Sequence, residues 1–129
     1  MPTFDDVRRI ALALPETSEK LSWGHATWRV KDKGFVWERP LRKSDLEALG
    51  DAAPDGSILG ARVENLMAKE ALLASDPDVY FTTPHFDGYP AVLVQLDRIT
   101  EEELTELIVE AWLDRAPAKL AQKYLDEAQ

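Results

Sequence analysis

The spacing of apolar residues predicts a helix near each end of the chain. Apolar side chains recur every three or four residues from Phe4 to Leu14, with Thr3 as a candidate N-cap and Pro15 as the residue that ends the helix. The strongest repeat runs from Leu104 to Trp112, and Thr100 begins a capping box before it. These patterns favour two amphipathic helices that each bury one face.

Capping residues and prolines predict three shorter helices. Ser44 and Glu47 match a capping box, Asn65 can cap the next helix, and proline is tolerated in the first turn of the last one. The stretch from Glu16 to Lys20 is interpreted as a loop. The predicted helical ranges are residues 44–50, 66–74 and 117–126.

Alternating apolar and polar residues predict about five strands, at residues 26–31, 35–39, 57–63, 79–83 and 91–96. The first two form a hairpin, because Lys31-Asp32-Lys33-Gly34 has the composition of a tight turn with Gly34 in the left-handed conformation. Phe35 and Trp37 share a face in this reading, and Gly60 is a candidate bulge. The order of elements predicts an α+β fold, a two-layer sandwich with a mostly antiparallel sheet of about five strands and helices packed on one face.

Composition favours one cytoplasmic domain over residues 1–129. A chain of 129 residues with 45% hydrophobic residues is long enough to bury roughly two thirds of its unfolded surface. The absence of cysteine excludes disulfides and thiolate zinc sites and fits a reducing compartment. No apolar run approaches the roughly 18 residues of a membrane span, so we expect no membrane contact. The formal charge of -9 opposes nucleic acid except at a local basic patch.

The predicted hairpin and its exit, residues 28–43, carry such a patch. The segment contains two acidic residues and six cations. The cations are Arg29, Lys31, Lys33, Arg39, Arg42 and Lys43. A basic ribbon of this kind can place cations on phosphates and an aromatic ring on a base, which predicts a nucleic-acid-binding site. The alternative is that Trp28, Phe35 and Trp37 belong to the core and the cations form an ordinary solvated face.

A second candidate is the polar and aromatic turn at residues 82–90. His85 and Asp87 are chemically able to do acid–base work or, together with His25, to bind a metal. The alternative, which we favour, is structural: glycine and proline shape the turn, Phe86 plugs an edge of the core and His85 hydrogen-bonds backbone. The candidate ligand-contact residues of this turn are His85, Phe86, Asp87 and Tyr89.

No motif in the chain fixes a reaction. Four carboxylates lie on one face of the predicted helix after Thr100, where they are interpreted as solvated: Glu102, Glu103, Glu106 and Glu110. Phosphate-binding loops, nucleophile elbows and zinc-protease strings do not occur in the sequence. We therefore expect no catalytic residue, metal or cofactor, and a binding protein rather than an enzyme.

Several short segments stand in a characteristic order and spacing over almost the whole chain: Leu14-Pro15 with Glu19, Trp23-Gly24 before Trp28-Arg29-Val30, Lys33-Gly34-Phe35, Thr83 to Pro90, Ala111-Trp112 and Ala116-Pro117. Together they resemble the MmcQ/YjbR-like family of small bacterial proteins. It implies a two-layer α+β fold similar to type III secretion chaperones and a role in DNA binding through a pair of wing-like hairpins. It implies no catalytic residue.

Three functional hypotheses follow from these features. The first is a non-enzymatic domain that binds DNA through the basic and aromatic hairpin. The second is a protein- or peptide-binding adaptor, alone or as a homodimer, which the acidic charge and the implied likeness to secretion chaperones favour. The third is a small enzyme that uses His85 and Asp87.

Overall fold

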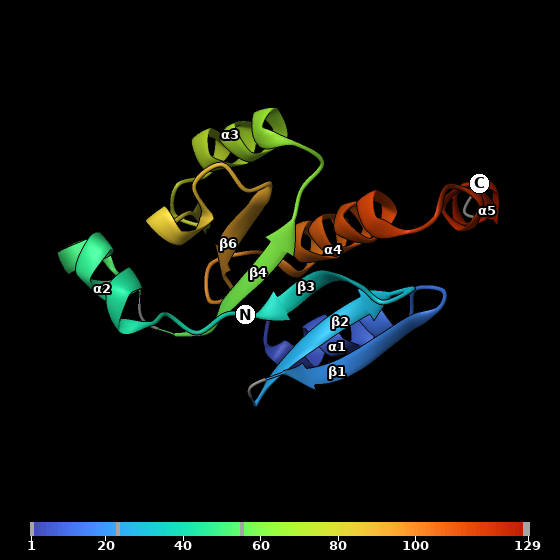
Figure 1. Ribbon diagram of the computed structural model, residues 1–129, viewed down its shortest axis with the longest axis horizontal. Coiled ribbons are helices and arrows are strands. Elements are labelled where there is room, and N and C mark those ends of the chain that lie inside the picture. The colour runs from blue at the N-terminus through green and yellow to red at the C-terminus, as the bar shows by residue number, and fades with distance from the viewer. Residues whose placement is uncertain (1, 23, 55, 128–129) are drawn as a thin grey trace.

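Six antiparallel strands form one open sheet in the computed structural model, which describes residues 2–22, 24–54 and 56–127. The strand order is β1-β2-β3-β4-β6-β5, and Figure 1 shows the sheet running from the β1–β2–β3 meander to β6. The strands are β1 (Thr17–Ser22), β2 (His25–Val30), β3 (Lys33–Glu38), β4 (Ile58–Arg62), β5 (Tyr80–Phe81) and β6 (Ala91–Gln95). The most apolar strand, β6, lies between β4 and β5, inside the sheet as its composition requires.

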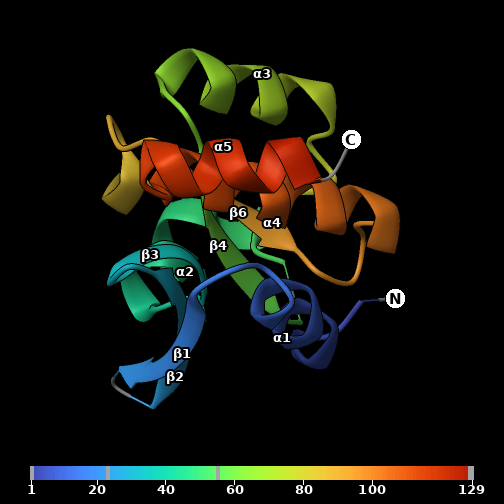
Figure 2. The same ribbon diagram turned by 90° about the vertical axis from the view of Figure 1, so that its right-hand side faces the viewer.

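Two helices cover one face of this sheet, and the others pack at its margins. The helices are α1 (Phe4–Leu12), α2 (Lys43–Leu49), α3 (Leu66–Ser75), α4 (Glu101–Arg115) and α5 (Ala118–Glu127), with 3-10 turns η1 (Gly50–Ala52) and η2 (Pro84–Phe86). Helices α1 and α4 pack on the buried face, α3 lies against β5 and β6, and α5 extends from the end of α4 (Figure 1). Figure 2 shows α1 and α3 on opposite sides of α4 and α5. The α+β class is confirmed.

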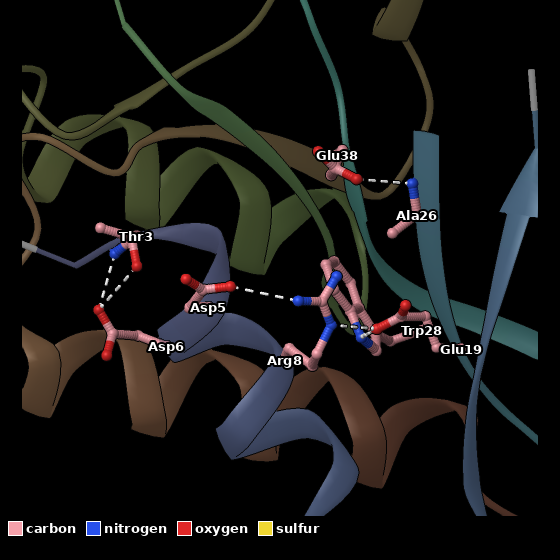
Figure 3. Close-up of polar contacts among 8 residues, drawn as sticks. All are labelled: Thr3, Asp5, Asp6, Arg8, Glu19, Ala26, Trp28 and Glu38. Carbon is pink, nitrogen blue, oxygen red and sulfur yellow. Dashed lines mark hydrogen bonds and ion pairs between the residues drawn. The ribbon is translucent and has the colours of Figure 1, made fainter. Parts of the chain in front are cut away.

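The larger core lies between the sheet and helices α1 and α4. Two tryptophans, Trp28 and Trp112, are fully buried in it, and each indole N–H has an acceptor. Trp28 Nε1 donates to Glu19 Oε1 at 2.9 Å, and Trp112 Nε1 donates to the carbonyl of Pro15 at 3.1 Å. The Arg8 guanidinium binds the same Glu19 oxygen at 2.7 Å (Figure 3). These contacts tie α1, β1, β2 and α4 together and satisfy the indole donors of both Trp28 and Trp112.

Glu19 is held in its charged form by the two donors. The hydrogen bond from Arg8 is the main cause that lowers the pKa of this carboxyl; partial burial acts in the opposite direction, and the Trp28 indole adds to the lowering. The motif residues Pro15, Glu19, Trp28 and Trp112 therefore share one structural task, the closing of the main core.

The opposite face of the sheet carries a second, smaller apolar cluster. Side chains alternate along β4 and β6, so Leu59 and Val92 enter the main core whereas Ile58 and Leu93 point the other way. Phe86 joins this second cluster, and Trp37, Leu41 and Phe81 pack against it. Both faces of the central strands are thus covered. Among the described residues, no helix has the length and apolar character that crossing a membrane requires.

The sheet has six strands rather than about five, because all of the predicted loop after Glu16 belongs to β1. This edge strand, Thr17–Ser22, is polar and lacks the apolar alternation by which the others were predicted. The predicted N-cap Ser44 is also wrong: α2 begins at Lys43 with Arg42 as N-cap, whose N–H donates to Asp45 Oδ2 at 2.8 Å. The caps at Asn65 and Thr100 are confirmed.

The hairpin between β2 and β3 differs from the prediction in the residues of its turn and in the sheet face to which Trp37 points. Lys31 and Asp32 adopt positive φ, of 49° and 67°, so they form a two-residue turn and Gly34 lies in the strand. The pairing passes from Trp28–Val36 to Arg29–Gly34, which leaves Phe35 as an extra, unpaired residue. As a result Phe35 and Val36 both enter the main core, and Trp37 faces the opposite cluster instead of sharing a face with Phe35.

Gly60 is not a bulge, because β4 pairs with β3 and β6 in regular register there. The glycine instead makes room for the indole of Trp37. A Cβ added at position 60 would lie 2.3 Å from Trp37 Cε2, far inside van der Waals contact.

We expect Gly60→Ala to destabilise the protein by about 1–3 kcal/mol, because the Trp37 indole must move to admit the new methyl group. Urea unfolding measures this loss. Gly34→Ala is the matched control, since its Cβ would meet only Thr27 Cγ2 at 3.1 Å. Equal midpoints for wild type and Gly60→Ala would contradict the packing described.

Candidate functional site

A cleft of about 530 Å³ opens beside the smaller cluster, where the two sequence-predicted sites meet. The hairpin contributes His25, Thr27 and Trp37, and the turn contributes His85 and Phe86. The remaining wall is the strand exit, Glu38 to Arg42. The fold therefore brings the two histidines of the chain, 60 positions apart in sequence, to one concave surface, which we call the hairpin cleft.

A buried ion pair fixes the wall of the hairpin cleft. Arg39 and Asp45 are 6% and 2% exposed, and their nearest nitrogen and oxygen are 3.0 Å apart. Arg39 also donates to the carbonyl of Pro40 at 2.5 Å, and its guanidinium lies 5.3 Å from the centre of the Phe86 ring. The pair thereby joins the end of β3, helix α2 and the η2 turn at one point.

Asp45 keeps its charge despite burial. Desolvation alone would raise the pKa of this carboxyl, but the hydrogen bond from the Arg42 backbone and the charge of Arg39 outweigh it, so that the pKa lies below the ordinary value. Asp45 therefore remains the counter-ion of Arg39 at neutral pH. The Arg39 charge is neutralised inside the protein and is not available to a ligand.

The opposite wall is held by a buried lysine from α3. Lys69 is 6% exposed, and its ammonium donates to the carbonyls of Phe86 at 2.6 Å and Tyr89 at 2.9 Å. Burial lowers the pKa of Lys69, and the nearby Asp87 charge partly offsets this. At the outer end of the turn, the Arg62 guanidinium stacks 5.0 Å from the Tyr89 ring. The backbone of the turn is thus fixed from α3 and β4.

The six predicted nucleic-acid-binding cations do not form one patch. Arg29 donates to the carbonyl and carboxylate of Asp32, Lys31 pairs with Glu16 at 2.6 Å, and Arg39 is buried with its partner. Lys33, Arg42 and Lys43 are exposed, and no ion pair to them occurs within the described ranges. Lys33 begins β3 whereas the other two follow its end, and a six-residue strand separates such points by about 20 Å.

The aromatic residues of the hairpin divide between the core and the cleft. Trp28 and Phe35 are completely buried, which confirms the core interpretation for them. Trp37 is only half-buried and lines the hairpin cleft, so it is the hairpin's one aromatic side chain with access to a ligand among residues 28–43.

The turn at residues 82–90 buries Phe86 and borders a cavity, but the predicted hydrogen bond from His85 to backbone does not occur among the described residues. Phe86 is 7% exposed and plugs the smaller cluster, as predicted. His85, Asp87 and Tyr89 are exposed, and the His85 ring stands edge-on to Phe86 at 4.9 Å. Within the described part of the chain, no group of three histidine, aspartate or glutamate side chains lies close enough to hold a metal ion.

Sequence reasoning missed the two residues that position the cleft, Asp45 and Lys69. Lys69 lies within the apolar stripe of α3, where a lysine looks like an ordinary solvated side chain. Asp45 lies between Ser44 and Glu47 of the predicted capping box and was given no role of its own. The signal available was an aspartate shortly after three cations, Arg39, Arg42 and Lys43, and the structure shows that its ion-pair partner is Arg39.

The sheet order, the helices over one face and the cleft on the other define a small α+β protein with an open antiparallel sheet. A family model described as YjbR matches residues 12–114, so the chain belongs to the YjbR family, as its motifs indicated. At 55% identity over 128 residues, it is similar to proteins described as uncharacterized in Mycobacterium bovis and Mycobacterium tuberculosis, covering 97% of each chain.

A solved structure shows the same fold. The crystal structure of Deinococcus radiodurans protein DR2400, with a DUF419 domain, matches with a TM-score of 0.66 and 22% sequence identity, over 88% of this chain and 78% of that one. At this level of identity the match concerns the fold alone.

We expect Asp45→Asn to destabilise the protein by about 3 kcal/mol at neutral pH, because it leaves the Arg39 charge buried without a counter-ion. Because the pKa of Asp45 is lowered in the folded protein, its stabilisation is complete above the ordinary carboxyl range and is lost as the pH falls below about 4. Urea unfolding of wild type and Asp45→Asn, at neutral pH and below about pH 4, measures the difference in stability.

The matched control is the double variant Arg39→Met/Asp45→Leu, which removes both charges and is expected to cost less than Asp45→Asn alone. A single variant as stable as wild type at neutral pH would show that the pair does not hold the cleft wall.

Proposed function

We propose that this protein is a non-enzymatic nucleotide-binding domain, and that the hairpin cleft accepts one nucleotide of a single DNA strand. The observation that carries the proposal is the meeting of Trp37, Arg42 and the two histidines in one cleft of about 530 Å³. That volume falls within the range of small-ligand pockets, about 300–1,000 Å³.

The lining offers a separate contact for each part of a nucleotide. The half-buried indole of Trp37 can stack on a base, an interaction of about 1–3 kcal/mol. Arg42 is exposed at the cleft and free of the internal pairing that occupies Arg39, so it can bind a phosphate. His25 and His85 add ring nitrogens that can donate hydrogen bonds to the same anion.

The geometry supports a single strand over a duplex. A duplex needs cations that follow its backbone, whereas the exposed cations of the hairpin stand at opposite ends of β3. Glu38 also lines the cleft, where its carboxylate accepts a hydrogen bond from the Ala26 N–H at 2.7 Å and would repel a second phosphate. One phosphate at Arg42 is therefore favoured over several.

The cleft gives little support for catalysis. No hydrogen bond between the described residues joins His25 or His85 to a carboxylate, which is the orienting contact of a general base. Asp87, the proposed partner of His85, is exposed and outside the cleft lining.

We expect a fluorescently labelled oligothymidylate of about eight nucleotides to bind saturably at low salt, with an affinity that falls as salt rises. Fluorescence anisotropy measures the Kd. Trp37→Leu and Arg42→Glu are each expected to weaken binding about tenfold or more, since each removes one ligand contact.

Lys33→Glu is the matched control for Arg42→Glu, because it makes the same charge change on an exposed residue at the other end of β3. Its effect is expected to stay within about twofold. Absence of saturable binding at about 20 mM salt, tighter binding of duplex than of single strand, or an equal loss in Lys33→Glu would overturn the proposal.

A further inference from the structure

A second cleft, also of about 530 Å³, lies between α3 and α4, and nothing in the proposed nucleotide site uses it. Its floor is apolar and consists of Val63, Ala68, Leu72 and Leu107. These side chains belong to or pack against the main core, whereas Trp37 and Phe86 of the hairpin cleft belong to the other cluster. The two clefts therefore lie on different faces of the sheet. We call this one the helix cleft.

Negative charge surrounds the apolar floor. Glu103, Glu106 and Glu110 of α4 line one side, and Glu64 and Asp76 line the other. None of these five carboxylates forms an ion pair in the described ranges, although acidic side chains elsewhere, such as Glu16 and Glu19, do. The acidic face of α4 that the sequence indicated is thus partly the rim of a cavity.

The cations and donors within the helix cleft do not neutralise this rim. Arg62 lines the cleft, but its charge faces Asp114, 3.6 Å away on α4, and the Tyr89 ring. Burial and the neighbouring Glu103 raise the pKa of Tyr80 to about 12, so its hydroxyl stays neutral and donates to Glu103 at 3.4 Å. Five carboxylates against one internally paired guanidinium leave an excess of negative potential over an apolar floor.

We propose that the helix cleft binds a small amphiphilic organic cation, a primary ammonium carried on an apolar body. The apolar body covers Leu72 and Leu107, and the ammonium donates to the carboxylates of Glu106 and Glu110 at the rim. A hydrated metal ion matches the rim but not the floor, and a neutral apolar ligand matches the floor but leaves the carboxylates without a counter-charge.

The size of the cleft favours a small molecule over a protein segment. Its volume lies within the small-ligand range, and its apolar floor is limited to four side chains. A protein partner typically covers about 800 Å² on each side. The large apolar side chains exposed on α3, Leu66 and Met67, do not extend the floor, because neither lines the cleft.

The test uses n-octylammonium as the probe and isothermal titration calorimetry on the full chain. Octanoate has the same tail with the opposite charge, and butylammonium has the same charge with a shorter tail. We expect saturable binding of octylammonium, and affinities at least about tenfold lower for the two controls, since each lacks one of the two contacts.

Variants separate the rim from the general acidity of the chain. Glu106→Gln is expected to weaken octylammonium binding about tenfold, whereas Glu102→Gln removes the same charge from the same helix outside the cleft and is expected to change it less than about twofold. Leu72→Asn is expected to weaken binding through the floor, with thermal unfolding as the check that the variant is folded.

The proposal would be overturned if octylammonium did not bind saturably or if octanoate bound equally well. It would also be overturned if Glu102→Gln weakened octylammonium binding as much as Glu106→Gln. Tighter binding of a lysine-rich peptide than of octylammonium would also overturn it, in favour of a protein partner. Binding of oligothymidylate is expected to be unchanged in Glu106→Gln. The proposals for the hairpin cleft and the helix cleft are therefore tested independently.

Discussion

The buried ion pair between Arg39 and Asp45 is the contact on which the functional face of the protein depends. It joins the end of β3 to the start of α2, which follows shortly in sequence, and holds both against the ring of Phe86 in the distant η2 turn. Without it, the wall between the hairpin and the turn would have no fixed geometry. The pair also removes Arg39 from the set of cations that a ligand can reach, and so leaves Arg42 as the exposed guanidinium of the cleft.

The turn that carries His85 is best understood as one wall of a shared cleft. Lys69 holds its carbonyls from α3, Phe86 anchors it in the smaller cluster, and Gly60 admits the Trp37 indole that faces it. Chemistry that looked separate in sequence, a basic hairpin and a histidine turn, is thereby brought to one concave surface. The family motifs divide accordingly, because Pro15, Glu19, Trp28 and Trp112 serve the main core while His85 and Phe86 border the cleft.

Elements with regular apolar spacing could be predicted from the sequence. Features that depend on tertiary contacts could not. Helices α1, α3 and α4 and strand β6 were predicted because their periodicity and caps are local properties. Strand β1 was missed because a polar edge strand is stabilised by pairing with β2 and not by its own pattern. The extra residue at Phe35 reversed the facing of Trp37, and no local signal marks such a bulge. The ion pair of Asp45 with Arg39 and the burial of Lys69 depend on how the segments pack in three dimensions, which periodicity does not encode.

An ¹H–¹⁵N NMR titration with thymidine 5′-monophosphate reports ligand contact at Trp37 directly. The indole N–H groups of Trp28 and Trp112 are internal references, because both are buried and bonded to Glu19 and Pro15. Nucleotide binding in the hairpin cleft predicts saturable shifts of the Trp37 indole and of the His85 and Phe86 amides, with the two reference indoles unmoved. A titration that leaves Trp37 unshifted, or that moves residues of α3 and α4 instead, would contradict it.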